Sequence, residues 1–186
     1  MSASIPELIE RADHGESAAV EELFASLYAE LHRLAEHQLR RGAPDATLGT
    51  TTLLHEAYLD LANRNGLRFP DRGRFFAYAS RAMRGLLMDY LRRRRAKKRG
   101  GEFQLTQFDE DAVSADDAQL LDLGPALDEL GALDPSLAEL VDLHFFCGLS
   151  FAEIASLRNV SERTVLRDWR AARLLLSRAL RPDDSH

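Results

Sequence analysis

The stretch that decides the fold of this chain is LSFAEIASLRNVSERTVLRDWRAARLLL, residues 149–176. It predicts two short helices joined by a tight turn, because apolar residues recur three or four positions apart on each side of Asn159. Asn tolerates the left-handed backbone of a tight turn, and the hydroxyl of Ser161 can cap the second helix by accepting from a free backbone N–H. A short helix, a turn and a second helix with arginines near its start are typical of a DNA-reading helix-turn-helix.

The second of these helices is expected to have two different faces. The apolar face carries residues spaced four, three and four apart, namely Val165, Trp169, Ala172 and Leu176. The other face carries Thr164 and the arginines Arg163, Arg167 and Arg170. This separation favours a helix that packs with one side and meets nucleic acid with the other. The alternative is an ordinary helical hairpin whose arginines are only solvated.

Length and composition narrow the class of protein. A chain of 186 residues can form one domain or two small ones. Its single cysteine, Cys147, excludes an internal disulfide framework and a multi-cysteine zinc site, and the histidines show no metal-binding spacing. We therefore expect no metal, no cofactor and no catalytic residues, and an enzyme is not indicated. No apolar stretch is long enough to span a membrane and no secretory leader precedes the first helix, so we expect a cytoplasmic protein without membrane contact.

Charge is strongly segregated along the chain. The net charge of −6 argues against DNA binding, yet residues 92–99 contain seven cations in eight positions. Residues 102–134 then contain ten acids and no lysine or arginine. Such a basic run favours contact with phosphates, although a solvated helix end is the alternative. We hypothesise that the acidic tether, residues 102–117, folds back on this basic run; a merely solvated tether is the alternative.

Hydrophobic periodicity predicts an all-α protein made of two small helical domains joined by an acidic flexible linker. Helices are expected over 5–9, extending no further than Gly15, and over 17–40, 50–63, 72–95 and 135–146, with a short one after Gly124-Pro125. Residues 102–117 lack sustained periodicity, which indicates the linker. In the long helix 72–95, Arg81 and Arg84 lie outside the expected apolar stripe.

Two segments together resemble the extracytoplasmic-function (ECF) group of bacterial RNA polymerase sigma factors. The segment RFFAYASRAMRGLLMDYLRRRR, residues 74–95, resembles the promoter-melting helix of that group and keeps its Asp-x-Leu-Arg-Arg ending at residues 89–93. The helix-turn-helix resembles the group's region 4, with matching residues at Glu153, Ile154, Ala155, Thr164, Val165, Ala172 and Arg173. The resemblance implies region 2 at residues 1–99, a linker at 100–118 and region 4 at 119–186.

The resemblance also implies a function and its residues. A sigma factor binds core RNA polymerase, through the clamp helices of the largest subunit and the flap of the second-largest, and directs initiation at chosen promoters. The implied −35 contacts are Ser161, Glu162, Arg163, Thr164, Arg167 and Arg170. The implied −10 contacts are Arg81, Arg84, Asp89, Arg92 and Arg93, beside a loop over 63–74 that would hold a flipped base. The implied polymerase-docking residues are Leu53, Leu54, Glu56, Ala57 and Tyr58.

Two departures from the group bear on these expectations. The recognition helix has Leu166 where the group usually places lysine or arginine, so the promoter preference does not carry over. The docking helix begins with Gly49, Thr50, Thr51 and Thr52 where the group has an acidic tetrad. We hypothesise that a serine/threonine kinase restores the negative charge by phosphorylating one of these threonines, because a phosphate adds nearly two charges. The alternative is that the threonines only cap the helix.

The sequence is also compatible with two other functions. A stand-alone helix-turn-helix regulator would bind duplex DNA without polymerase, and an acidic helical adaptor would show no salt-dependent DNA binding. Control by an anti-sigma factor in place of a kinase is a further alternative.

Overall fold

The computed structural model describes residues 3–43, 47–64, 68–100 and 115–181, which contain helices and no strand. The first group of helices comprises α1 (Ile5–Asp13), α2 (Ser17–Ser26), α3 (Tyr28–Gly42), α4 (Thr50–Asn63) and α5 (Arg72–Gly100). The second comprises α6 (Ala115–Leu133), α7 (Pro135–Val141), the π-helical turn η1 (Asp142–Phe146), α8 (Phe151–Arg158) and α9 (Glu162–Leu180). The all-α prediction is confirmed.

Aromatic side chains hold the first helix group together. Phe75 on α5 is fully buried and packs edge-to-face on Phe24 and Phe69, with ring centroids 5.5 Å away in each case. Tyr58 on α4 packs edge-to-face on the same Phe24 ring, at 5.2 Å. These edge-to-face pairs match the positive edge of one ring to the negative face of another, which stabilises them beyond simple burial. The aromatic cluster therefore joins α2, α4 and α5 around one centre.

The first group differs in one place from the helices expected. The helix predicted over 17–40 is two helices, α2 and α3, which meet at Leu27. Leu27 has φ −105° and ψ 10°, outside the helical range, and its side chain is 1% exposed. The apolar repeat continues across the break because Leu27 still packs inward, so periodicity alone did not reveal the bend.

The second group also departs from the prediction at its start. A helix was expected only after Gly124-Pro125, whereas α6 begins at Ala115 and continues through both residues. Asp134 caps α7, accepting from the backbone N–H groups of Ser136 and Leu137. The predicted helix 135–146 changes at Asp142 into the π-helical turn η1. Such a turn places one extra residue within a helix.

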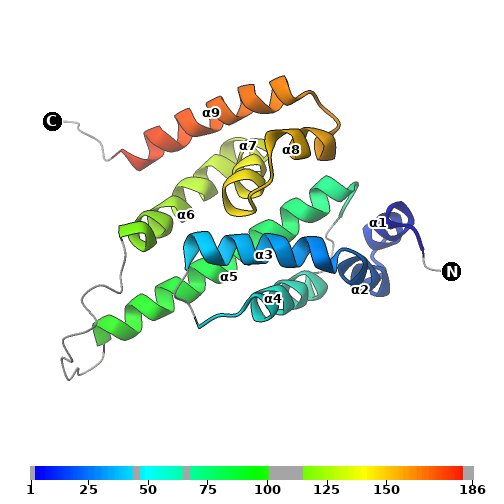
Figure 1. Ribbon diagram of the computed structural model, residues 1–186, viewed down its shortest axis with the longest axis horizontal. Coiled ribbons are helices and arrows are strands. Elements are labelled where there is room, and N and C mark those ends of the chain that lie inside the picture. The colour runs from blue at the N-terminus through cyan, green and yellow to red at the C-terminus, as the bar shows by residue number, and fades with distance from the viewer. Residues whose placement is uncertain (1–2, 44–46, 65–67, 101–114, 182–186) are drawn as a thin grey trace.

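The two groups pack directly on each other. In Figure 1, α5 runs between α4 on one side and α6 and α7 on the other. The larger cluster of buried apolar side chains runs from Leu8 in the first group to Val165 in the second. The smaller cluster joins Met88 of α5 to residues of α6, α7 and α9. Each of the two apolar clusters therefore contains side chains from both helix groups.

Three expectations fall wholly or partly outside the described residues. Most of the linker predicted over 100–118 does so, while residues 115–118 belong to α6. The hypothesis that the tether folds back on residues 92–99 concerns the same segment. The loop expected to hold a flipped base, over 63–74, is described only at 63–64 and 68–74.

Candidate nucleic-acid interface

The turn between α8 and α9 has the geometry that the sequence predicts. Asn159 lies in the left-handed region, with φ 53° and ψ 45°, and ends α8. Ser161 caps α9, its side chain accepting from the N–H of Thr164. A reciprocal capping box fixes the start of α8, because Ser150 Oγ accepts from Glu153 N–H while the Glu153 carboxylate accepts from Ser150 N–H. Caps at both helix starts and the left-handed turn set the direction of α9.

The face of α9 that was predicted to meet DNA is open to solvent. Most of its predicted contact residues are exposed, namely Ser161, Glu162, Arg163, Arg167 and Arg170, and Thr164 is half-buried. The opposite face packs inward, and Trp169 contacts the rings of His144 and Phe151 at centroid distances of 4.6 and 5.7 Å. The apolar and basic faces of α9 are thus separated as the sequence predicts.

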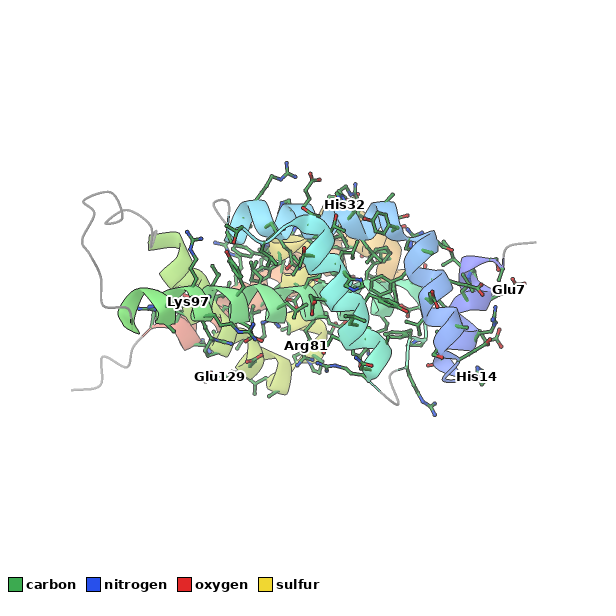
Figure 2. All side chains as sticks on the ribbon, turned by 90° about the horizontal axis from the view of Figure 1, so that it is seen from below. Glu7, His14, His32, Arg81, Lys97 and Glu129 are labelled. Atoms are coloured by element: carbon green, nitrogen blue, oxygen red, sulfur yellow. The ribbon has the colours of Figure 1, made fainter. Side chains whose placement is uncertain are left out.

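The predicted −10 residues on α5 have mixed environments. Arg81, Asp89, Arg92 and Arg93 are exposed, and Arg92 Nη1 lies 2.9 Å from Asp89 Oδ1. Arg81 lies at the edge of α5 beside α6 and α7 in Figure 2, and Lys97 lies nearer the end of the helix. Arg84 lies outside the apolar stripe of α5, yet it is only 6% exposed and is not free to contact DNA in this arrangement. The second helix group covers it.

Arg84 is buried against an acid that the sequence analysis did not single out. Its Nε lies 2.6 Å from Oδ1 of Asp142, which is 2% exposed and begins η1. The two atoms form an ion pair without the alignment of a hydrogen bond. Burial raises the pKa of Asp142 to about 6, although the charges of Arg84 and Arg81 oppose the shift. Only the long-range packing of η1 on α5 brings this pair together, so no local signal marked it.

We expect the Asp142 carboxyl to stabilise the folded protein increasingly as the pH falls from about 6 to about 4. Its pKa is about 6 in the folded protein against an ordinary 3.8, so the folded state holds a proton that the unfolded state releases. The proton contributes its full stabilisation below the ordinary pKa, and this stabilisation is lost as the pH rises through 6. Between these two pH values the free energy of unfolding changes by up to roughly 1.4 kcal/mol per pH unit. Urea unfolding of wild type and Asp142→Asn at several pH values isolates the group, and a pH-independent difference would contradict the shift.

Polar contacts surround the ion pair and join the same two helix groups. The Gln38 side-chain amide donates to Cys147 Sγ (3.5 Å), and the Cys147 thiol donates to Ser80 Oγ (2.9 Å). His37 Nδ1–H donates to the Phe146 carbonyl at 2.8 Å. Burial raises the pKa of the Cys147 thiol to about 12, so it stays protonated. We call these contacts, together with the Arg84–Asp142 pair, the α5–η1 interface.

Two clefts follow the line where α5 meets the second group. One, of about 450 Å³, lies between α4, α5 and α6, and the other, of about 590 Å³, lies between α5, α6 and α7. Arg81, Arg84 and Asp128 line both clefts. Both clefts are therefore bordered by cations of α5 and by an acid of α6.

The predicted polymerase-docking helix α4 presents different residues from those expected. Leu53, Leu54 and Ala57 are buried in the core, and Tyr58 is half-buried. Glu56 is exposed, and so are neighbours that the sequence analysis did not select as docking residues, His55 and Leu59. A partner of α4 would touch these exposed side chains, whereas the buried leucines position the helix.

The threonines at the start of α4 do not cap it. The N-cap residue is Gly49, and no side chain makes a capping hydrogen bond there. Thr50 is half-buried, while Thr51 and Thr52 are exposed in the first turn. The first turn of α4 contains no acid.

The described residues give no sign of two other kinds of site. These residues contain no group of histidine, cysteine, aspartate or glutamate that could hold a metal ion. In the same part of the chain no helix is both long and apolar enough to cross a membrane.

Comparison with known proteins defines the class to which this fold and these basic faces belong. The model of the ECF sigma factor family matches residues 2–182, so the chain belongs to that family. ECF sigma factors bind core RNA polymerase and promoter DNA and direct transcription initiation; they are not a class of enzymes. One similar protein is the ECF RNA polymerase sigma factor BldN of Streptomyces coelicolor, 30% identical over 188 residues. The alignment covers 99% of this chain and 68% of BldN.

Proposed function

We propose that this chain directs core RNA polymerase to a subset of promoters by binding the −35 element through α9. The observation that supports this most strongly is the arginine face of α9, exposed behind a capped left-handed turn. Arginines near the start of such a helix can donate two bonds to a guanine edge or grip phosphates. In this proposal residues 119–186 form region 4 and also meet the flap of the second-largest subunit.

Residues 1–99 form region 2 in the same proposal. The exposed cations of α5, namely Arg81, Arg92 and Arg93, would follow the opened −10 strand, and Arg84 would join them when uncovered. Capturing unstacked bases offsets the cost of melting, a few kcal/mol per step. The exposed side of α4, with Glu56, would meet the clamp helices of the largest subunit. The helix-turn-helix alone would also suit a regulator that acts without polymerase.

The test is reconstitution with purified components. The chain should co-purify with core RNA polymerase and give defined transcripts in run-off assays on genomic promoter fragments, which core polymerase alone does not. A regulator would instead shift duplex operator DNA by itself. Transcription unchanged by adding the chain, together with a specific duplex shift, would replace the sigma-factor mechanism by the regulator.

We further propose that phosphorylation of Thr51 or Thr52 strengthens docking on polymerase. Both side chains are exposed in the first turn of α4, a turn that contains no acid. A phosphate there would accept hydrogen bonds from the free N–H groups and would be attracted by the positive end of the helix dipole. The capping alternative has lost its support, because Gly49 occupies the N-cap. A serine/threonine kinase is the partner that this mechanism requires.

Phosphothreonine installed genetically at position 52 should raise affinity for core polymerase by about tenfold, because the phosphate can form a new charge-assisted hydrogen bond with the partner, which contributes about 1.5–3 kcal/mol. Affinity would be measured against unmodified protein and against Thr51→Ala/Thr52→Ala. Phosphoserine at Ser26, which is exposed at the end of α2 and outside α4, is the control. Equal affinities for all four proteins would leave the threonines without a regulatory role.

A further inference from the structure

Arginines on one face of α5 are matched by acids from the second helix group. Arg74 pairs with Glu139 of α7, and Arg84 pairs with Asp142 of η1. Arg81 lies between them in sequence and lines both clefts together with Asp128 of α6. Spacings of seven and three residues put the three arginines on one side of the helix. We call Arg74, Arg81 and Arg84 the arginine row and Asp128, Glu139 and Asp142 the acidic face.

The ion pair between Arg84 and Asp142 is almost completely covered, although Arg84 reaches the wall of both clefts. Arg84 and Asp142 are 6% and 2% exposed, so a phosphate can reach Arg84 only after η1 has moved away. Exposed ion pairs contribute little and are screened by salt, but a pair removed from water is screened much less. The pairing of the arginine row with the acidic face therefore includes one ion pair that is removed from water, and not only exposed salt bridges.

The arrangement treats the two candidate DNA-binding surfaces differently. Arg163, Arg167 and Arg170 on α9 remain exposed while Arg84 on α5 is covered. When the two helix groups are packed together, the candidate −35 surface on α9 is therefore free, and part of the candidate −10 surface on α5 is hidden. The Asp142 carboxylate pairs with Arg84 in this arrangement.

We propose that the acidic face is an internal mimic of DNA phosphates, which pairs with the arginine row and keeps its buried member, Arg84, from single-stranded nucleic acid until the two helix groups separate. The inference rests on the proposed role of α5 in binding the opened strand. It places the self-masking acids in α6, α7 and η1, which contact α5 directly, rather than in the tether 102–117. Strand binding and separation of the groups are then coupled: each promotes the other to the same degree.

Gly148 permits the close approach of the second helix group to α3 that the packed arrangement requires. Gly148 follows η1 with φ +73°, and a Cβ built there would lie 2.5 Å from the ring of His37 on α3. The same ring donates to the Phe146 carbonyl across the α5–η1 interface. An added methyl group would therefore displace the His37 ring and break its hydrogen bond to the Phe146 carbonyl, which weakens the contact between the groups. Gly15 is a matched control, because its φ is +88° and an added Cβ would meet nothing within 4 Å.

Cys147 is a built-in reporter of opening. It is the single cysteine of the chain, is 4% exposed and contacts Ser80 and Gln38 of the opposite helix group. Its reaction with a maleimide should therefore require separation of the groups. For the wild-type full chain at low salt, saturating oligodeoxythymidine should accelerate the reaction by roughly 5- to 150-fold, as expected for coupled sites. No acceleration at saturation would overturn the proposal.

Variants that weaken the contact between the two helix groups test whether separation of the groups raises the affinity for single-stranded DNA. Gly148→Ala should react faster at Cys147 and bind oligodeoxythymidine more tightly by a similar factor, with unchanged helix content by circular dichroism, while Gly15→Ala should match wild type. Asp142→Lys, which places a cation against Arg84, should act like Gly148→Ala. Faster reaction without tighter binding would show that the interface does not mask the row. These assays contain no polymerase, so failure of run-off transcription would refute the proposed function separately.

Discussion

Replacing Phe75 by alanine should lower the free energy of unfolding by roughly 3–5 kcal/mol, the cost of a large cavity in a packed core. The ring is fully buried and makes edge-to-face contacts with Phe24, Phe69 and Phe76. Its loss removes apolar burial and three aromatic pairs at once, and these neighbours come from α2, α5 and the segment before α5. Urea unfolding followed by circular dichroism measures the change.

The matched control for Phe75 is Tyr28, an aromatic residue of α3 that is 46% exposed. Tyr28→Ala should change the free energy of unfolding by less than about 1 kcal/mol, because little packing is lost. A loss of similar size for both variants would mean that the aromatic cluster is not the centre of the first helix group.

Combined replacement of Arg167 and Arg170 by alanine should nearly abolish promoter-specific transcription. Each arginine should cost roughly 1–3 kcal/mol if it reads a base with two hydrogen bonds, and the two costs add if the contacts are independent. Both side chains are exposed, so their removal leaves the core of α9 intact. Run-off transcription by reconstituted polymerase, on promoters identified from its own transcripts, measures the effect.

A double variant at the other end of α9 separates base contact from lost charge. Arg178 and Arg181 are exposed near the C-terminal end of this helix, and Arg178→Ala/Arg181→Ala removes the same two charges. It should retain most activity, because region 4 would present only the start of the helix to the major groove. Equal losses for the two double variants would reduce the role of α9 to non-specific attraction.

Local signals in the sequence were enough to predict the α8–α9 turn. Asn159 and Ser161 act through their own backbone or through the next turn of helix, so residue type and spacing determine the outcome. The exposed arginine face of α9 follows from the same periodicity.

The environment of Arg84 could not be predicted in this way. Periodicity shows which face of α5 is apolar, and Arg84 lies outside that face. Whether a second helix group covers the remaining surface depends on tertiary packing, and the partner Asp142 lies far along the chain. The buried leucines of α4 show the converse: Leu53 and Leu54 match a docking motif in the sequence, yet both are used for the core.

The extra residue in η1 determines how far the end of this helix reaches along the first helix group. A π-helical turn accommodates one more residue than an α-helical turn, so deleting one position from 143–146 would restore α-helical bonding and shift the residues that follow by about the 1.5 Å rise of one residue. Asp142 would keep its place against Arg84, while Cys147 would lose its place against Ser80. Chimeras that exchange the C-terminal helices between relatives should therefore be joined after residue 146, or must keep the number of residues in this turn.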